Sequence, residues 1–143
     1  MDSLVLFKRI LILGKFKLNH DNHSNGFTVV FDNGYTISVQ FGKFSYCNNN
    51  DLKIDYDLKE IPKALDCENA EIAIMYPGGG FIPWKEGDDV HGYTTPNEVS
   101  LLMMYISTIQ ENDIVEIIDM NKIRANLEEH IRPVLEEGIL LNV

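Results

Sequence analysis

Residues 26–41 read Gly-Phe-Thr-Val-Val-Phe-Asp-Asn-Gly-Tyr-Thr-Ile-Ser-Val-Gln-Phe, and they hold the strongest fold signal in the chain. Residues 26–31 and 35–41 are rich in β-branched and aromatic types, and the turn-forming triplet Asp32-Asn33-Gly34 separates them, which is typical of a β-hairpin. In 35–41 apolar and polar side chains alternate. One face of the hairpin is therefore predicted to be buried, and the other face to be exposed to solvent or to line a functional site.

Further strands are predicted on both sides of this hairpin. The apolar run from Leu4 to Leu13 indicates a strand, with a helix as the alternative, and the polar stretch from Asn19 to Asn25 indicates a loop. The segment from Cys47 to Asp66 is expected to be irregular, because it combines an Asn-rich turn signal with alternating charges and a proline.

Residues 71–76 predict another strand, Glu-Ile-Ala-Ile-Met-Tyr. Pro77 and three glycines then turn the chain into residues 81–84, which we interpret as the second strand of another hairpin. Pro83 lacks a backbone N–H and therefore suits an edge strand.

The periodicity becomes helical at Thr95. Thr95 is predicted as the N-cap, Pro96 as the first helical residue and Glu98 as the reciprocal partner in a capping box. The apolar stripe of this helix comprises Val99, Leu102, Met103, Ile106 and Ile109. A last helix is predicted from about Asn121, because Ile123, Leu127 and Ile131 are four residues apart, and Pro133 and Gly138 are expected near its end.

The order of elements predicts an α+β fold, with an N-terminal antiparallel β-sheet built from hairpins followed by C-terminal α-helices. A chain of 143 residues with 45% hydrophobic content suits one core, so we expect a single domain over 1–143, with 1–94 mainly β and 95–143 mainly α. The excess of apolar residues in the last helix and in the tail at 139–141 predicts a homo-oligomer.

Charge and composition exclude several classes of function. The 22 acidic and 12 basic residues give a net charge of −10, which opposes binding to duplex nucleic acid but allows a small nucleotide held by two or three local cations. Neither a membrane helix nor a signal peptide is predicted, so a cytosolic protein is expected. Cys47 and Cys67 lack metal-site or redox-motif spacing and are predicted to be reduced and structural.

Candidate chemistry concentrates between Trp84 and Val99. The helix start at Thr95 exposes unpaired N–H groups that favour an anion. Asp88, Asp89 and His91 are alternatives for metal binding, acid–base chemistry, ligand hydrogen bonding or simple loop solvation. The three glycines at 78–80 lack the other residues of a Walker or dinucleotide motif, and there is no nucleophile elbow. We therefore expect a protein that is not an enzyme and has no cofactor or metal.

Three aromatic residues, Phe81, Trp84 and Tyr93, flank the acidic loop and are candidates for stacking on a purine, with core packing as the alternative. Trp84 is favoured because it adjoins Lys85 and a predicted edge. Cations are scarce, and Arg124 lies early in the last predicted helix.

Two stretches resemble a known family of small phage proteins. They are residues 25–42 with Tyr46-Cys47, and residues 70–73 leading to 88–99. The family is the Thoeris anti-defence family, first type. The resemblance implies an antiparallel sheet with C-terminal helices, and an assembly of dimers or higher oligomers with ligand pockets between subunits.

By function, the resemblance implies a sponge in the cytoplasm of the infected bacterial host. Such proteins bind cyclic ADP-ribose isomers made by bacterial TIR-domain immune enzymes without cleaving them, and some also capture cyclic oligonucleotides of a related pathway, CBASS. An aromatic residue stacks on the purine, with Phe81 or Trp84 as the candidate here, and arginines hold the diphosphate. The helix after Pro96 has no arginine, so Arg124 is the candidate cation.

Together these arguments predict a ligand site formed by Phe81, Trp84, Lys85, Asp88, Asp89, Tyr93, Thr95, Asn97 and Arg124. The leading hypothesis is a nucleotide sponge. The alternatives are an acidic protein–protein inhibitor of a host factor, favoured by the net charge, and a phosphoesterase that uses Asp88, Asp89 and His91.

Overall fold

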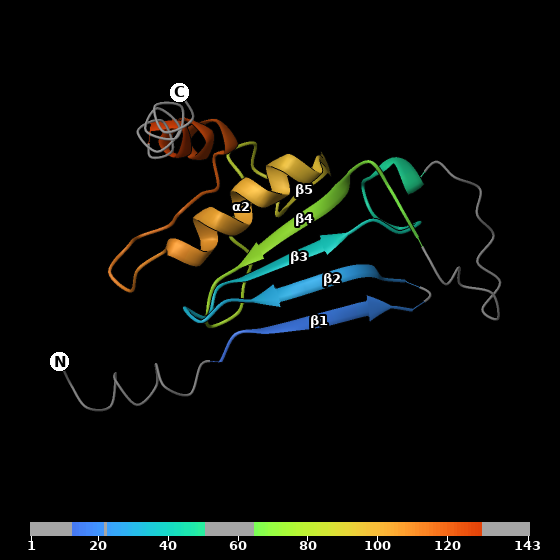
Figure 1. Ribbon diagram of the computed structural model, residues 1–143, viewed down its shortest axis with the longest axis horizontal. Helices are drawn as coiled ribbons and strands as arrows, with labels where there is room; N and C mark the ends of the chain where they lie inside the picture. Colours follow the sequence, from blue (N-terminus) through green and yellow to red (C-terminus); the bar gives the residue numbers. More distant parts are fainter. Residues whose placement is uncertain (1–12, 22, 51–64, 130–143) are drawn as a thin grey trace, which may run out of the picture.

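The computed structural model describes residues 13–21, 23–50 and 65–129. Its elements are five strands, β1 (Lys15–His20), β2 (Asn25–Val30), β3 (Thr36–Gln40), β4 (Ala70–Met75) and β5 (Val90–Thr94), with the 3-10 helix η1 (Asn48–Asn50) and the helix α2 (Pro96–Thr108). The strands form one antiparallel sheet in chain order, and a further helix begins at residue 120 and is described to residue 129 (Figure 1). The predicted α+β fold is confirmed.

The central hairpin forms as its sequence predicts. Strands β2 and β3 pair in the register Val29 to Ile37, and Gly34 in the connecting turn takes a φ of 87°, which favours glycine. On one face the apolar side chains of β3 and β4 are buried. On the other face Gln40 Nε2 donates hydrogen bonds to Asn19 Oδ1 and Ser38 Oγ, at 3.1 and 3.2 Å. The sheet thus has one core face and one polar face.

Helix α2 packs on the core face over β3. Its buried side chains are Val99, Leu102 and Ile106, at the helical spacing that the sequence shows. The capping box is present: the Thr95 hydroxyl accepts the Glu98 N–H at 3.3 Å, and the Glu98 carboxylate accepts the Thr95 N–H at 3.1 Å. Because the box fixes where α2 starts, it also fixes which side chains meet the sheet.

The strands at the two edges of the sheet differ from the prediction. Strand β1 begins at Lys15 and runs through Asn19, where a loop was expected, while the strand predicted from Leu4 falls on residues 1–12, outside the described part of the chain, except at Leu13. Strand β5 occupies Val90–Thr94, in a stretch that we interpreted as a loop. Both edge strands mix strand-forming residues with polar residues or glycine, and each pairs with one neighbouring strand of the sheet.

The predicted second hairpin is reduced to one bridge, between Met75 and Phe81. Beyond Pro83 the chain pairs elsewhere, and Trp84 forms a parallel bridge to Ile118. The later part of the predicted last helix, with Pro133 and Gly138, and the apolar tail at 139–141 lie outside the described residues, as do residues 51–64 of the predicted irregular segment.

None of the helices in the described part of the chain combines the length and the apolar composition that a bilayer crossing requires. Cys47 and Cys67 are both free thiols, and burial raises the pKa of Cys47 to about 11. This high pKa keeps the Cys47 thiol protonated and unreactive at neutral pH.

Asn33 ties the β2–β3 turn to the end of α2. Its Nδ2 donates to the carbonyl oxygens of Ile106 and Ile109, at 2.7 and 3.1 Å, and its Oδ1 accepts the Tyr35 N–H at 3.1 Å. Carbonyl groups at a helix C-terminus have no partner within the helix. One side chain therefore joins hairpin and helix while satisfying two of these acceptors.

We expect Asn33→Ala to lower the free energy of unfolding by about 1–3 kcal/mol, because the substitution removes the side-chain donor of the Ile109 carbonyl and leaves the Ile106 carbonyl with only the Ile109 N–H. Urea denaturation measures the change. The matched control is Asn112→Ala, at an exposed turn residue whose side chain makes no hydrogen bond within the described residues, and its change should stay below about 0.5 kcal/mol. Equal effects of the two substitutions would contradict the role of Asn33.

Candidate functional site

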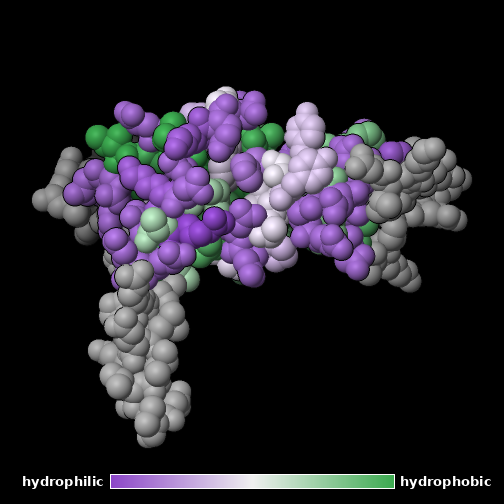
Figure 2. Space-filling view, turned by 90° about the horizontal axis from the view of Figure 1, so that it is seen from above, coloured by the Kyte–Doolittle hydropathy of each residue, from purple (hydrophilic) through white to green (hydrophobic). Residues whose placement is uncertain are grey.

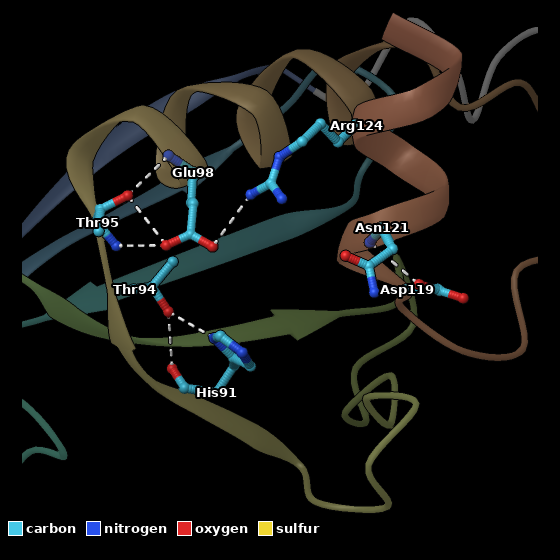
Figure 3. Close-up of polar contacts among 7 residues, drawn as sticks. All are labelled: His91, Thr94, Thr95, Glu98, Asp119, Asn121 and Arg124. Carbon is cyan, nitrogen blue, oxygen red and sulfur yellow. Dashed lines mark hydrogen bonds and ion pairs between the residues drawn. The ribbon is translucent and has the colours of Figure 1, made fainter.

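The N-terminus of α2 and the last helix meet at Glu98. Arg124 Nη2 lies 3.5 Å from Glu98 Oε2, while Glu98 Oε1 accepts hydrogen bonds from the backbone N–H and the hydroxyl of Thr95, at 3.1 and 3.0 Å (Figure 3). Arg124 comes from the helix described over residues 120–129. The structure therefore places Arg124 across the Glu98 carboxylate from Thr95 (Figure 3), at the first turn of α2, the end that carries a partial positive charge.

The capping box occupies most of the donors at this helix end. Pro96 has no N–H, and the N–H groups of Thr95 and Glu98 both donate within the box. The exposed residue Asn97 carries the one N–H in this first turn that the box does not use. An anion at this end would meet the Asn97 N–H and the Arg124 guanidinium, and it would compete with Glu98 for Arg124.

Trp84, the favoured aromatic candidate, is a core residue. Its side chain is 1% exposed, and its ring stacks on His91 with centroids 4.6 Å apart. The chain doubles back directly after it, because the Trp84 carbonyl accepts the Gly87 N–H and Gly87 takes a φ of 98°. This turn holds Trp84 under the surface, so its ring is not available to a ligand in this structure.

Lys85 and Asp119 form an ion pair at 3.4 Å. The Asp119 carboxylate also accepts the N–H groups of Asn121 and Lys122, at 3.1 and 3.3 Å, and so caps the last helix. These backbone hydrogen bonds, chiefly that from Lys122, and the nearby Lys85 ammonium lower the pKa of Asp119. Lys85 therefore already has an anionic partner, which ties the start of the last helix to the loop after Trp84.

An open hollow of about 450 Å³ brings other predicted residues together. It is lined by Tyr46, Asp88, Asp89, Val90, Gly92 and Tyr93. The two tyrosine side chains are 59% and 50% exposed. The Tyr93 N–H donates to the Tyr46 carbonyl at 2.9 Å, and Gly92 lets the two segments approach, since a Cβ there would lie 2.7 Å from the Tyr46 Cβ.

Tyr46 is the residue that sequence reasoning about the site missed. It lies in a segment without periodic structure, and only its contact with β5 brings it to the hollow. The other predicted aromatic, Phe81, is half-exposed beyond the glycine turn and does not line this hollow. The exposed aromatic surface beside the acidic pair is therefore made by Tyr46 and Tyr93.

His91 does not share the hollow that Asp88 and Asp89 line. His91 packs on Trp84, and its Nδ1 lies 2.7 Å from the Thr94 hydroxyl, whereas Asp88 and Asp89 line the hollow without it. Across residues 13–21, 23–50 and 65–129, no group of three or more His, Cys, Asp or Glu side chains is arranged to hold a metal ion.

A second surface lies at the loop that follows α2. Seen from above, the molecule is mostly hydrophilic, and hydrophobic residues gather toward the end where this loop lies (Figure 2). Met104, Ile114 and Ile117 are exposed there, and a hollow of about 300 Å³ runs between the loop, Tyr105 and the last helix. Exposed apolar surface of this kind is typical of a protein interface.

Comparison of the chain with models of protein families, with curated proteins and with solved structures finds no match. The resemblance to the Thoeris anti-defence family therefore rests on the motifs at residues 25–42 with Tyr46-Cys47 and at 70–73 leading to 88–99 alone.

Proposed function

We propose that this chain is a phage anti-defence sponge. It binds cyclic ADP-ribose-type signalling nucleotides in the cytoplasm of the infected host and holds them intact, which blocks Thoeris immunity, and cyclic oligonucleotides of CBASS are further candidate ligands. One observation carries the proposal. Arg124, which the sequence analysis named as the candidate phosphate-binding cation, lies at the N-terminus of α2, and α2 begins three residues after Tyr93, whose ring is half-exposed.

The helix end at Arg124 and the hollow at Tyr93, which Thr94 and Thr95 link along the chain, offer different chemistry, and the combination suits a nucleotide. Arg124 and the Asn97 N–H donate hydrogen bonds and attract phosphate oxygens. The hollow at Tyr46 and Tyr93 offers aromatic faces for a purine. Asp88 and Asp89 repel phosphate but accept hydrogen bonds from ribose hydroxyls. A ligand with a base, riboses and a diphosphate has a group for each surface.

Homo-oligomer formation is part of the proposal. The exposed apolar residues at the loop after α2 support it, and so does the acidic lining of the hollow beside Tyr93, because a second subunit could supply further cations. Light scattering at micromolar concentration tests this point: we expect a mass of at least two chains, and a monomer would contradict it.

Titration calorimetry with a panel of cyclic ADP-ribose isomers and cyclic di- and trinucleotides tests the function. We expect at least one ligand to bind with micromolar or tighter affinity, and heat denaturation of the complex to return it chemically unchanged. A degraded ligand would show an enzyme. No binding across the panel would contradict the proposal.

Two substitutions test the site. Arg124→Gln should weaken binding of that ligand by about tenfold or more, because charge-assisted hydrogen bonds to phosphate are worth about 1.5–3 kcal/mol. Glu98→Gln keeps an acceptor for the capping box but removes the charge that competes for Arg124. Since an exposed ion pair is worth up to about 1 kcal/mol, this variant should bind up to about fivefold more tightly.

The matched control is Lys122→Gln, which removes a cation from the same helix on the side of the other hollow. It should leave the affinity within about twofold of the wild-type value, as expected for a rim charge. Equal losses in Arg124→Gln and Lys122→Gln would indicate a general effect of charge and would contradict a phosphate site at Arg124.

An acidic inhibitor of a host protein is the second candidate function, favoured by the net charge of −10. It would show itself in the same study if the chain captured one host protein stoichiometrically and carried no small molecule by mass spectrometry.

A further inference from the structure

Strand β1 leaves part of the core face of the sheet uncovered. Phe16 and Leu18 pair with Val29 and Phe27 of β2, so their side chains lie on the face that α2 covers farther along the sheet. Val29 is buried, yet Phe16 is 83% and Leu18 is 80% exposed, and Leu13 just before the strand is exposed as well. The apolar surface of the core face therefore continues past the edge of the helix layer.

The dimensions of the sheet explain the gap. Neighbouring strands lie about 4.8 Å apart and a helix with its side chains is about 10 Å across, so one helix covers about two strands. Helix α2 contacts β3, and Ile82, Trp84 and Ile118 fill the side toward β5. In Figure 1 α2 lies on the β4 and β5 side of the sheet, away from β1, and Phe16 and Leu18 of β1 are exposed.

We propose that residues 4–12 of the same chain cover this face by packing on Phe16 and Leu18. These residues read Leu-Val-Leu-Phe-Lys-Arg-Ile-Leu-Ile and are apolar except for Lys8 and Arg9. Only Leu13 and Gly14 separate them from β1. Nine residues span about 14 Å as a helix and more when extended, which is enough to lie over both exposed side chains.

Gly14 fixes the position of the chain just before β1. Its N–H donates to Asp32 Oδ1 at 2.8 Å, which anchors the start of β1 beside the β2–β3 turn. A Cβ at Gly14 would lie 2.6 Å from the same carboxylate oxygen. The preceding segment is thereby tethered at one end of the uncovered face.

A second copy of the chain is a less suitable occupant of this edge. Antiparallel pairing of two β1 strands in the register that joins Phe16 to Leu18 would set Lys17 of one copy against Lys17 of the other, and like charges on facing strands destabilise pairing. A two-residue link also gives residues 4–12 an effective concentration of about millimolar or higher, above that of a separate molecule at micromolar concentration.

Hydrogen–deuterium exchange of the full chain tests the proposal. In the wild type we expect the amides of residues 4–12 to exchange at least about tenfold more slowly than in a Phe16→Ser/Leu18→Ser variant. Dilution of the wild-type protein should leave this exchange rate unchanged. The matched control, Lys15→Ser/Lys17→Ser, changes the opposite face of the same strand and should keep the wild-type protection.

Three outcomes would overturn the proposal. Exchange of residues 4–12 at the rate of an unstructured peptide in the wild type would show that the segment does not pack, whether or not the double variant folds. Protection lost on dilution would assign the face to a second copy. Protection that requires vesicles of anionic phospholipid would assign it to a lipid surface. None of these depends on nucleotide binding.

Discussion

The Glu98 carboxylate is the interaction on which most of this structure depends. It completes the capping box and so fixes where α2 begins, which decides that Val99, Leu102 and Ile106 face the sheet. The same carboxylate pairs with Arg124 and thereby ties the helix described over residues 120–129 to α2. Fold and candidate site share this residue, because the cation that would attract a ligand is positioned by the anion that begins the helix.

The parts of the fold that sequence reasoning predicted are those specified by local chemistry. The hairpin around Asp32-Asn33-Gly34 and the helix start at Thr95 depend on turn and capping residues within a few positions of one another. Strands β1 and β5 depend on distant partners. Val90–Thr94 contains strand-forming Val90, Tyr93 and Thr94 but is short and is interrupted by Gly92, and it is a strand here because it pairs with the edge of β4.

The candidate site follows the same division. Arg124 could be named from the sequence because arginines are scarce, and the structure places it at the predicted helix end. Trp84 could not be placed correctly, since its burial results from the turn at Gly87 and the bridge to Ile118. Tyr46 was missed for the opposite reason, because a residue in an irregular segment gains a position only through the strand it contacts.

Tyr93 has a backbone φ of 53°, a left-handed conformation that costs a non-glycine residue about 1 kcal/mol or more, while its neighbour Gly92 is the residue free to adopt it. Folding alone would favour the reverse order. The glycine instead occupies position 92, where a Cβ would collide with the Tyr46 side chain. Tyr93 occupies the next position, where the backbone takes the left-handed conformation. The exposed Tyr93 ring therefore comes with a strained backbone in β5. A substitution at Tyr93 would change both the stability of β5 and the aromatic surface of the hollow.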